Sequence, residues 1–236
     1  MNTKTIITID GPAGTGKSAV AAGLARRLAL PYLDTGAMYR AATLAALEQH
    51  LDLEDRDALT RLVEHCRIDL DVQPGRYAIR LDDRDVTDAI RHPRVTDHAH
   101  YLARDPQVRE CLVRQQRQIG CRLGSLVTEG RDQGTVVFPH ADFKFYLDAS
   151  PECRAKRRLN QLHQKGMAAD YDQILAAQRQ RDQRDAARAV GPLKPAPDAI
   201  VIDTSKLTLE QVIDTLYRRI TQKSPPLDHN RNTAPE

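Results

Sequence analysis

The sequence carries little net charge and few aromatic residues. Its 35 basic and 32 acidic side chains leave a formal net charge of +3 over 236 residues, and aromatic residues make up only 4%. A protein that grips nucleic acid through a general basic surface normally has a larger basic excess and more rings on which bases can stack. We therefore expect no nucleic-acid partner.

Closely spaced cysteines and long apolar runs are also missing. The four cysteines form no C-x-x-C pair, so neither a zinc site nor a disulfide framework is expected. No apolar run approaches the roughly 20 residues of a membrane span, and no signal peptide precedes the first apolar segment. These features predict a cytoplasmic protein without a membrane partner.

Among the basic residues arginine dominates, with 27 arginines against eight lysines. The planar guanidinium suits bidentate recognition of phosphate. A G+C-rich genome would produce the same excess, so the positions of the arginines must decide between the two explanations.

Five short apolar runs alternate with helical stretches. A length of 236 residues with 41% hydrophobic residues suits one domain, over residues 1–223. Apolar residues recur at helical spacing in residues 17–30, which predicts a first helix. Residues 37–49 are predicted to form a second helix. Because strands and helices alternate, we expect an α/β fold with a five-stranded parallel sheet covered by helices on both faces. The expected strands are residues 4–10, 31–34, 125–129, 143–148 and 199–203.

Residues 67–86 depart from this alternation of strands and helices. Apolar and polar residues alternate there around Pro74-Gly75, which predicts a half-exposed antiparallel hairpin. We interpret 66–95 as a flap inserted between two helices. The tail, 224–236, has the composition of a disordered end.

One motif determines the chemistry. The sequence between the first strand and the first helix matches G-x-x-x-x-G-K-[ST], the phosphate-binding loop, or P-loop. Its glycines let backbone N–H groups surround phosphate oxygens, Lys17 reaches the β- and γ-phosphates, and the Ser18 hydroxyl can bind Mg²⁺. We assign ATP binding to Gly11, Pro12, Ala13, Gly14, Thr15, Gly16, Lys17, Ser18 and Ala19.

A P-loop alone fits a kinase, a GTPase or a motor ATPase. A GTPase should carry an N-K-x-D motif for guanine, and no Asn-Lys pair occurs in the chain. The chain is also short for a motor. The remaining charges therefore indicate a kinase with a small-molecule acceptor.

Two segments offer charges for a second phosphate. Thr35 is a natural N-cap for the second helix, and Arg40 lies about one turn further along it. Glu129, Arg131 and Asp132 follow the third strand, at the edge where parallel sheets hold ligands. Alternatively, Glu129 and Asp132 simply pair with Arg131.

Arginines cluster again near the C-terminus. Residues 170–190 contain no Gly or Pro, so we expect one helix with Arg181, Arg184, Asp185 and Arg188 on one face. The preceding helix begins with Arg154, Arg157 and Arg158. Such clusters often form solvated faces. Two arginine-bearing helices around the flexible 164–166 connection in a P-loop protein favour a mobile lid over 154–192.

These motifs together resemble those of the bacterial cytidylate kinases, from Ile6 to about Tyr217. The resemblance rests on ITIDGPAGTGKS, LDTGAMYRA, EGRDQGTVVFP, FYLDASPECRAKRR and QRDQRDAARAVGPL. It implies a P-loop kinase core with an NMP-binding flap and a short helical lid. It also implies a monomer that uses ATP and Mg²⁺ to phosphorylate CMP and dCMP.

The resemblance assigns roles to individual residues. The CMP phosphate should contact Arg40, Arg131 and Arg188 beside Thr35, while Asp185 and Arg181 should reach the ribose. Arg109 and Asp132 should face the cytosine. Stabilisation of the transferred phosphoryl group falls to Lys17, Mg²⁺ at Ser18 and Glu129, and lid arginines such as Arg158 and Arg184, together with Arg131, Asp132 and Arg188.

Three positions depart from the family pattern. Thr35 replaces the usual Ser and keeps a hydroxyl, and Glu129 stands where Asp is frequent. His100 occupies a position where a Ser commonly helps to recognise the base. Either His100 reads the base, or it turns away and leaves Arg109 and Asp132 to read cytosine, or His98 or Tyr101 is the relevant neighbour.

Two rival functions remain open at this point. One is a P-loop kinase for another nucleotide or a non-nucleotide acceptor. The other is a non-catalytic nucleotide-binding or RNA-binding module, which the near-neutral charge and few aromatics disfavour.

Overall fold

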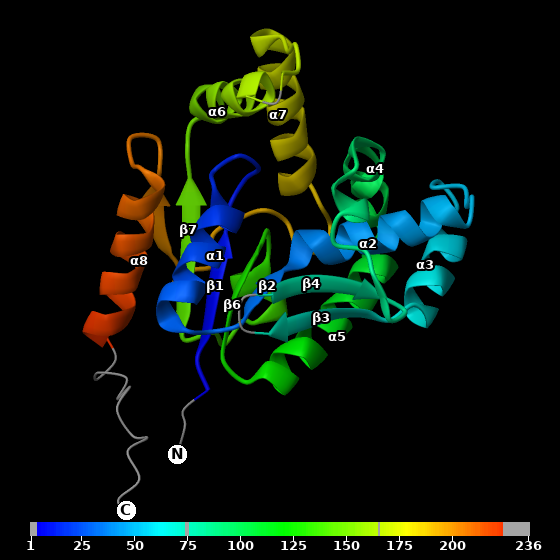
Figure 1. Cartoon of the computed structure of the whole chain (residues 1–236), viewed down its shortest axis with the longest axis horizontal. Coiled ribbons are helices and arrows are strands. Elements are labelled where there is room, and N and C mark those ends of the chain that lie inside the picture. Colours follow the sequence, from blue (N-terminus) through cyan, green and yellow to red (C-terminus); the bar gives the residue numbers. More distant parts are fainter. Residues whose placement is uncertain (1–3, 74–75, 165, 224–236) are drawn as a thin grey trace, which may run out of the picture.

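A five-stranded parallel sheet forms the centre of the computed structural model, which describes residues 4–73, 76–164 and 166–223 (Figure 1). Its strands are β1 (Ile6–Asp10), β2 (Tyr32–Asp34), β6 (Leu126–Gly130), β7 (Phe143–Asp148) and β8 (Ile200–Asp203). The spatial order is β2-β6-β1-β7-β8, with every pairing parallel. The predicted α/β fold and its five strands are confirmed.

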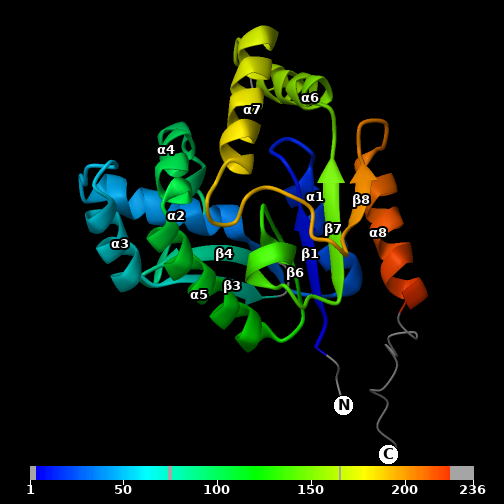
Figure 2. The same ribbon diagram turned by 180° about the vertical axis from the view of Figure 1, so that it is seen from behind.

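Helices cover both faces of this sheet (Figure 2). They are α1 (Lys17–Leu28), α2 (Thr35–Glu48), α3 (Arg56–His65), α4 (Pro93–Arg104), α5 (Pro106–Leu123), α6 (Pro151–Gln164), α7 (Tyr171–Ala186) and α8 (Leu209–Lys223). Short turns of 3-10 and π type lie at Ala89–Arg91 and Gln133–Val137.

Successive side chains of the strands point to opposite faces of the sheet, which divides the buried core into two clusters. Ile7 and Ile9 of β1 and Val127 of β6 pack with the apolar residues of α1 and α8. Leu126 of β6 lies in the opposite cluster, with α2, α3 and α5. Because successive side chains point to opposite faces, one strand contributes to both layers. The sheet is buried on both faces, and its carboxyl edge is left for ligands.

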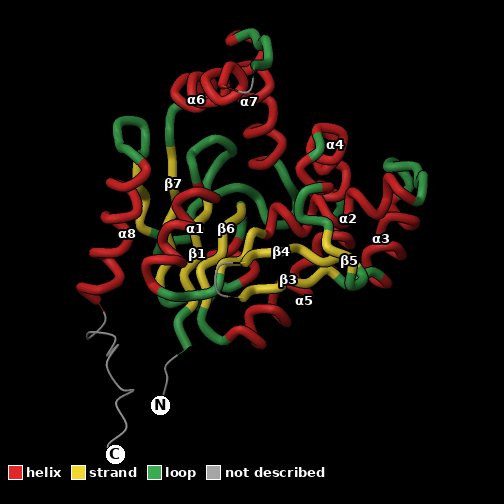
Figure 3. Tube along the Cα trace, in the orientation of Figure 1, coloured by secondary structure: helices red, strands yellow, loops and turns green. Residues whose placement is uncertain are grey.

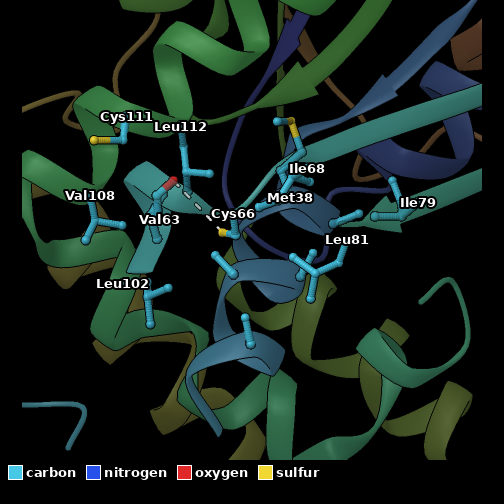
Figure 4. Close-up of a cluster of buried hydrophobic side chains, with 14 of the residues drawn as sticks. Met38, Val63, Cys66, Ile68, Ile79, Leu81, Leu102, Val108, Cys111 and Leu112 are labelled. Atoms are coloured by element: carbon cyan, nitrogen blue, oxygen red, sulfur yellow. Dashed lines mark hydrogen bonds between the residues drawn. The ribbon is translucent and has the colours of Figure 1, made fainter. Parts of the chain in front are cut away.

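The predicted hairpin is present, and it has a third strand. β3 (Ile68–Gln73) pairs antiparallel with β4 (Arg76–Leu81), which pairs with the short β5 (Arg84–Asp85) (Figure 3). The Pro74-Gly75 turn lies outside the described residues. Alternate residues such as Ile68, Ile79 and Leu81 face the cluster beneath α2, α3 and α5 (Figure 4).

Two helices stand above the carboxyl edge of the sheet. α6 follows β7, and α7 packs beside α6, over the loop between β1 and α1 (Figure 1). Residue 165, in the predicted connection, lies outside the described residues, as does the tail, 224–236. No helix in the described ranges is long and apolar enough to cross a membrane.

The prediction of a single helix over 170–190 is wrong at its C-terminal end. α7 ends at Ala186, where the Leu193 N–H donates to the Asp185 carbonyl at 2.9 Å and folds the chain back. This bond from the following loop replaces the next helical turn, so Arg188 lies beyond the helix.

Candidate active site

The P-loop carbonyls accept hydrogen bonds from Lys17 of the loop itself and from two side chains outside it. Lys17 Nζ donates to the Pro12 carbonyl at 2.7 Å, and the Arg154 guanidinium donates to that of Ala13 at 3.0 Å. The Thr204 hydroxyl donates to the Thr15 carbonyl at 3.3 Å. These hydrogen bonds hold the carbonyl oxygens of the loop. We therefore expect the N–H groups of the loop and of the N-terminus of α1 to be free to bind phosphate.

Gly11 opens the loop where no side chain fits. Its φ is +147°, and an added Cβ would lie 2.1 Å from the Leu147 carbonyl oxygen. Gly16 also has a positive φ, +91°, but a Cβ there would meet nothing within 4 Å. Comparing the same substitution at Gly11 and at Gly16 therefore separates the effect of backbone strain from that of steric overlap.

We expect Gly11→Ala to lower the free energy of unfolding by roughly 3–5 kcal/mol, because strain and a backbone overlap add. Gly16→Ala should cost only about 1–2 kcal/mol, from strain alone. Urea unfolding of both variants measures the difference. Equal losses would show that the contact with Leu147 does not determine the loop's geometry.

Lys17 is almost completely buried at 5% exposure. Burial and repulsion from Arg131 lower the pKa of Lys17 to about 7, against an opposing attraction from Glu129. Because burial is the main cause of the lowered pKa, an anion bound beside Lys17, such as an ATP phosphate, would stabilise its ammonium form.

Ser18 and Glu129, the predicted metal ligands, are brought together. The Ser18 hydroxyl donates to Glu129 Oε1 at 2.7 Å, and Asp34 on β2 is in register with Glu129 on β6. Burial and the neighbouring Asp34 raise the pKa of Glu129. Within the described ranges no cluster of three or more His, Cys, Asp or Glu side chains would hold a metal by itself. Mg²⁺ fits these residues, because it commonly takes one or two protein oxygens and completes its shell with phosphates and water.

The predicted N-cap of the second helix is wrong by one residue. Asp34 is the cap, and its carboxylate accepts the Ala37 N–H at 2.9 Å. Thr35 is the first helical residue, and its hydroxyl donates to the Glu129 carbonyl at 2.7 Å. Both residue types cap helices well. Asp34 takes the position because its second oxygen also pairs with Arg40, at 3.1 Å.

Arg131 does not pair with Glu129 or Asp132, so that alternative is wrong. Its Nε donates to Asp185 Oδ2 of α7 at 2.9 Å, and Arg188 pairs with the other oxygen of Asp185. Although burial opposes ionisation, Arg131, Arg188 and Arg181 hold the pKa of Asp185 below its ordinary value. One buried carboxylate thus gathers two of the predicted phosphate-binding arginines.

Asp132 pairs with Arg109, both of them buried. Burial raises the pKa of Asp132, although Arg109 opposes this. Among the described residues, Arg109 Nε is one of the few buried polar side-chain atoms without a hydrogen-bond partner. The Arg109–Asp132 pair therefore holds one buried donor whose hydrogen bond is not made within the described residues.

The other predicted residues lie at the rim. Arg158, Arg181 and Arg184 are exposed on α6 and α7, and Ala19 is exposed in the first turn of α1. His100 is exposed on α4, with Nδ1 2.8 Å from the Asp97 carbonyl and its ring 4.3 Å from that of Tyr101. Desolvation lowers the pKa of His100, and the nearby Arg184 lowers it further.

Sequence reasoning missed Asp10, at the end of β1. Its carboxylate accepts the N–H groups of Gln133 and Gly134, both at 2.8 Å, and so holds the turn that follows Arg131 and Asp132. Burial raises the pKa of Asp10 to about 7, against the two backbone hydrogen bonds. Its position at the carboxyl edge of a parallel strand was the available signal.

A comparison with protein families supplies the decisive observation. The family model for cytidylate kinase matches residues 7–222. The chain belongs to the cytidylate kinase family. The match covers the P-loop, the antiparallel sheet, the α6–α7 pair and α8, so it includes every element that contributes to the site.

Individual relatives agree with the family assignment. The chain is 46% identical to a cytidylate kinase of Nocardia farcinica over 222 residues, covering 94% of this chain and 96% of that protein. It is 44% identical to a cytidylate kinase of Escherichia coli, covering 92% and 96% of the two chains. The fold is similar to that of an uncharacterized protein from Eubacterium ventriosum, with a TM-score of 0.52, 14% identity, and coverage of 93% and 99%.

Proposed function

We propose that this protein transfers the γ-phosphoryl group of ATP to CMP and dCMP, giving CDP and dCDP. The family match over residues 7–222 carries the proposal. The geometry supports it, because a P-loop and a second set of arginines lie at one sheet edge. We propose a cytoplasmic monomer with small-molecule substrates and without a nucleic-acid or membrane partner.

The acceptor phosphate would bind by replacing carboxylates. Arg40 and Arg131 are each paired with an aspartate in this structure, and Arg188 shares Asp185 with Arg131. A dianionic phosphate accepts the same bidentate hydrogen bonds as a carboxylate, with more charge. We propose that CMP draws these guanidinium groups from Asp34 and Asp185, and that Asp185 is thereby released toward the ribose hydroxyls, together with Arg181.

Transfer would need positioning and charge more than proton chemistry. An oxygen of the CMP phosphate is already nucleophilic near neutral pH, so no side chain has to act as a base. We propose that Lys17 neutralises charge on the donor phosphates and that Arg131, Arg188 and the rim arginines Arg158 and Arg184 do so at the transferred group. Mg²⁺ held at Ser18 and Glu129 would supply charge neutralisation between the phosphates. The lid over 154–192 would exclude water, which would otherwise hydrolyse ATP.

Initial rates of ADP formation test this function. Mg-ATP alone should give almost no ADP, and CMP or dCMP should start its formation. Rapid ADP formation without an acceptor would contradict a kinase. A preference for an unrelated acceptor would favour another P-loop kinase.

His100 gives a prediction about base choice. A carbonyl accepts from its Nδ1, so in the neutral ring Nε2 is an acceptor. Such an acceptor suits the amino group of cytosine and repels the carbonyl of uracil. Because the pKa of His100 lies below its ordinary value near 6.5, the ring is neutral at pH 7. Protonation at lower pH turns Nε2 into a donor and weakens the preference for cytosine.

We therefore expect the ratio of kcat/KM for CMP to that for UMP to fall several-fold between pH 7.5 and about pH 5.5. In His100→Ser the ratio should stay constant, since a hydroxyl serves as donor or acceptor. If the CMP/UMP ratio had the same pH dependence in the two proteins, His100 would play no part in base recognition. Arg109 and Asp132 would then recognise cytosine.

A further inference from the structure

Arg154 is a buried cation at the base of α6, between the P-loop and α7. It is only 2% exposed, on the first turn of α6. Its Nε donates to the Ala149 carbonyl at 2.9 Å, and one terminal nitrogen donates to the carbonyl of Ala13 in the P-loop at 3.0 Å. The two terminal nitrogens also bind Asp182 of α7, at 3.2 and 2.6 Å. A single guanidinium thus joins the base of α6, the P-loop and α7.

α7 also contacts the P-loop directly. Gln178 lies one turn before Asp182, and a Cβ added to Gly14 would meet its Nε2 at 3.3 Å and the Arg154 Cβ at 3.2 Å. Gln178 Oε1 is one of the few buried polar side-chain atoms without a partner among the described residues. Gln178 of α7 therefore lies close to the loop, Asp182 on the next turn reaches it through Arg154, and Asp185, a turn further along, holds Arg131 and Arg188.

We propose that Arg154 is a positioning residue for the P-loop, and that Asp182 makes the position of its guanidinium depend on the lid helix α7. If α7 moves away, Arg154 remains buried without its carboxylate, which is costly. The guanidinium must then follow Asp182 or turn, and either movement removes a donor from the Ala13 carbonyl. The donor phosphates therefore meet a correctly shaped loop only when α7 lies over it. This inference deepens the proposed function and rests on it.

The chain provides a matched control. Arg179 of α7 pairs with Glu152 of α6 at 2.6 Å, and both side chains are exposed. This ion pair joins the same two helices as Arg154–Asp182, but within the described residues neither Glu152 nor Arg179 forms a hydrogen bond or ion pair with the P-loop. Glu152→Gln therefore reports what an α6–α7 pair contributes to stability alone.

The experiment measures ADP binding by calorimetry in the full chain. Asp182→Asn should raise the Kd for ADP about tenfold and the KM for ATP by a similar factor, while the KM for CMP stays within twofold. Glu152→Gln should bind ADP as the wild type does. Thermal unfolding establishes that each variant is folded.

A second variant keeps the test decisive if Asp182→Asn folds poorly. Arg154→Lys retains the charge, but one ammonium group cannot reach Ala13, Ala149 and both Asp182 oxygens. It should also raise the Kd for ADP about tenfold. Wild-type ADP binding by folded Arg154→Lys, or equal losses in Asp182→Asn and Glu152→Gln, would overturn the proposal. Because ADP binding needs no acceptor, its outcome is independent of whether the wild type forms ADP in a CMP-dependent reaction.

Discussion

Lys17→Met should lower turnover by roughly two to three orders of magnitude while leaving the fold intact. Lys17 is the buried cation of the P-loop, with its ammonium 2.7 Å from the Pro12 carbonyl. Methionine fills a similar volume, so packing is retained and the preorganised charge is lost. Steady-state rates with saturating Mg-ATP and CMP measure the loss, and circular dichroism establishes the fold.

Lys144 offers a closely matched control. Its ammonium donates to the Pro139 carbonyl at 2.6 Å, five residues earlier in the chain, as that of Lys17 does to Pro12. Lys144 also pairs with Asp198, away from the P-loop. Lys144→Met should keep turnover within about threefold of the wild type, since it removes no charge that the transition state needs. Similar turnover in the two variants would contradict the assignment of Lys17.

Asp185→Ala is expected to damage the acceptor side of the reaction severely. Its carboxylate holds Arg131 at 2.9 Å and also pairs with Arg188. In the proposed complex the ribose hydroxyls replace these arginines at Asp185. A hydrogen bond to a charged group contributes roughly 1.5–3 kcal/mol, so losing two of them should lower kcat/KM for CMP by a factor of about 10²–10⁴. The Kd for ADP should change little. Rates at varied CMP and calorimetry with ADP separate the two effects.

Asp172, exposed in the first turn of the same helix, provides the comparison. Asp172→Ala removes the same group from α7 and should leave both CMP and ADP parameters near those of the wild type. If Asp185→Ala weakened ADP binding as strongly as it weakened the use of CMP, Asp185 would be a structural residue of α7 and not part of the acceptor site.

The sequence was sufficient for the sheet and for the P-loop. Strand 143–148 was predicted with the bounds that the structure has, because its alternating apolar residues lie between polar turns. The P-loop was predictable because its chemistry is local: glycines, Lys17 and Ser18 act within eight residues of chain, between a strand and a helix. Local pattern and local structure coincide in both cases.

The partners of the site charges could not be predicted in the same way. Arg131 and Asp185 are 54 residues apart, and Arg154 and Ala13 are 141 apart. The sequence groups Arg154 with Arg157 and Arg158 as cations at the start of a lid helix, yet Arg154 is buried against the P-loop and Arg158 is exposed. Which of several equivalent arginines meets which carboxylate depends on tertiary packing, which the sequence pattern does not contain.

The predicted C-terminal end of the helix over 170–190 was wrong for a related reason. Residues 187–190 contain no helix breaker, so local propensity continues the helix. The hydrogen bond from Leu193 to the Asp185 carbonyl ends it instead, and Arg188 still pairs with Asp185 three residues earlier. A contact with the loop that follows thus overrides a weak helical preference.

CMP and dCMP kinase activity is tested most directly by the initial rate of ADP formation at fixed Mg-ATP with CMP, dCMP, UMP and AMP as acceptors. We expect high kcat/KM for CMP and dCMP, lower values for UMP and AMP, and almost no ADP without an acceptor. An equal or higher kcat/KM for AMP or UMP, or ADP formation that does not depend on CMP, would contradict this activity.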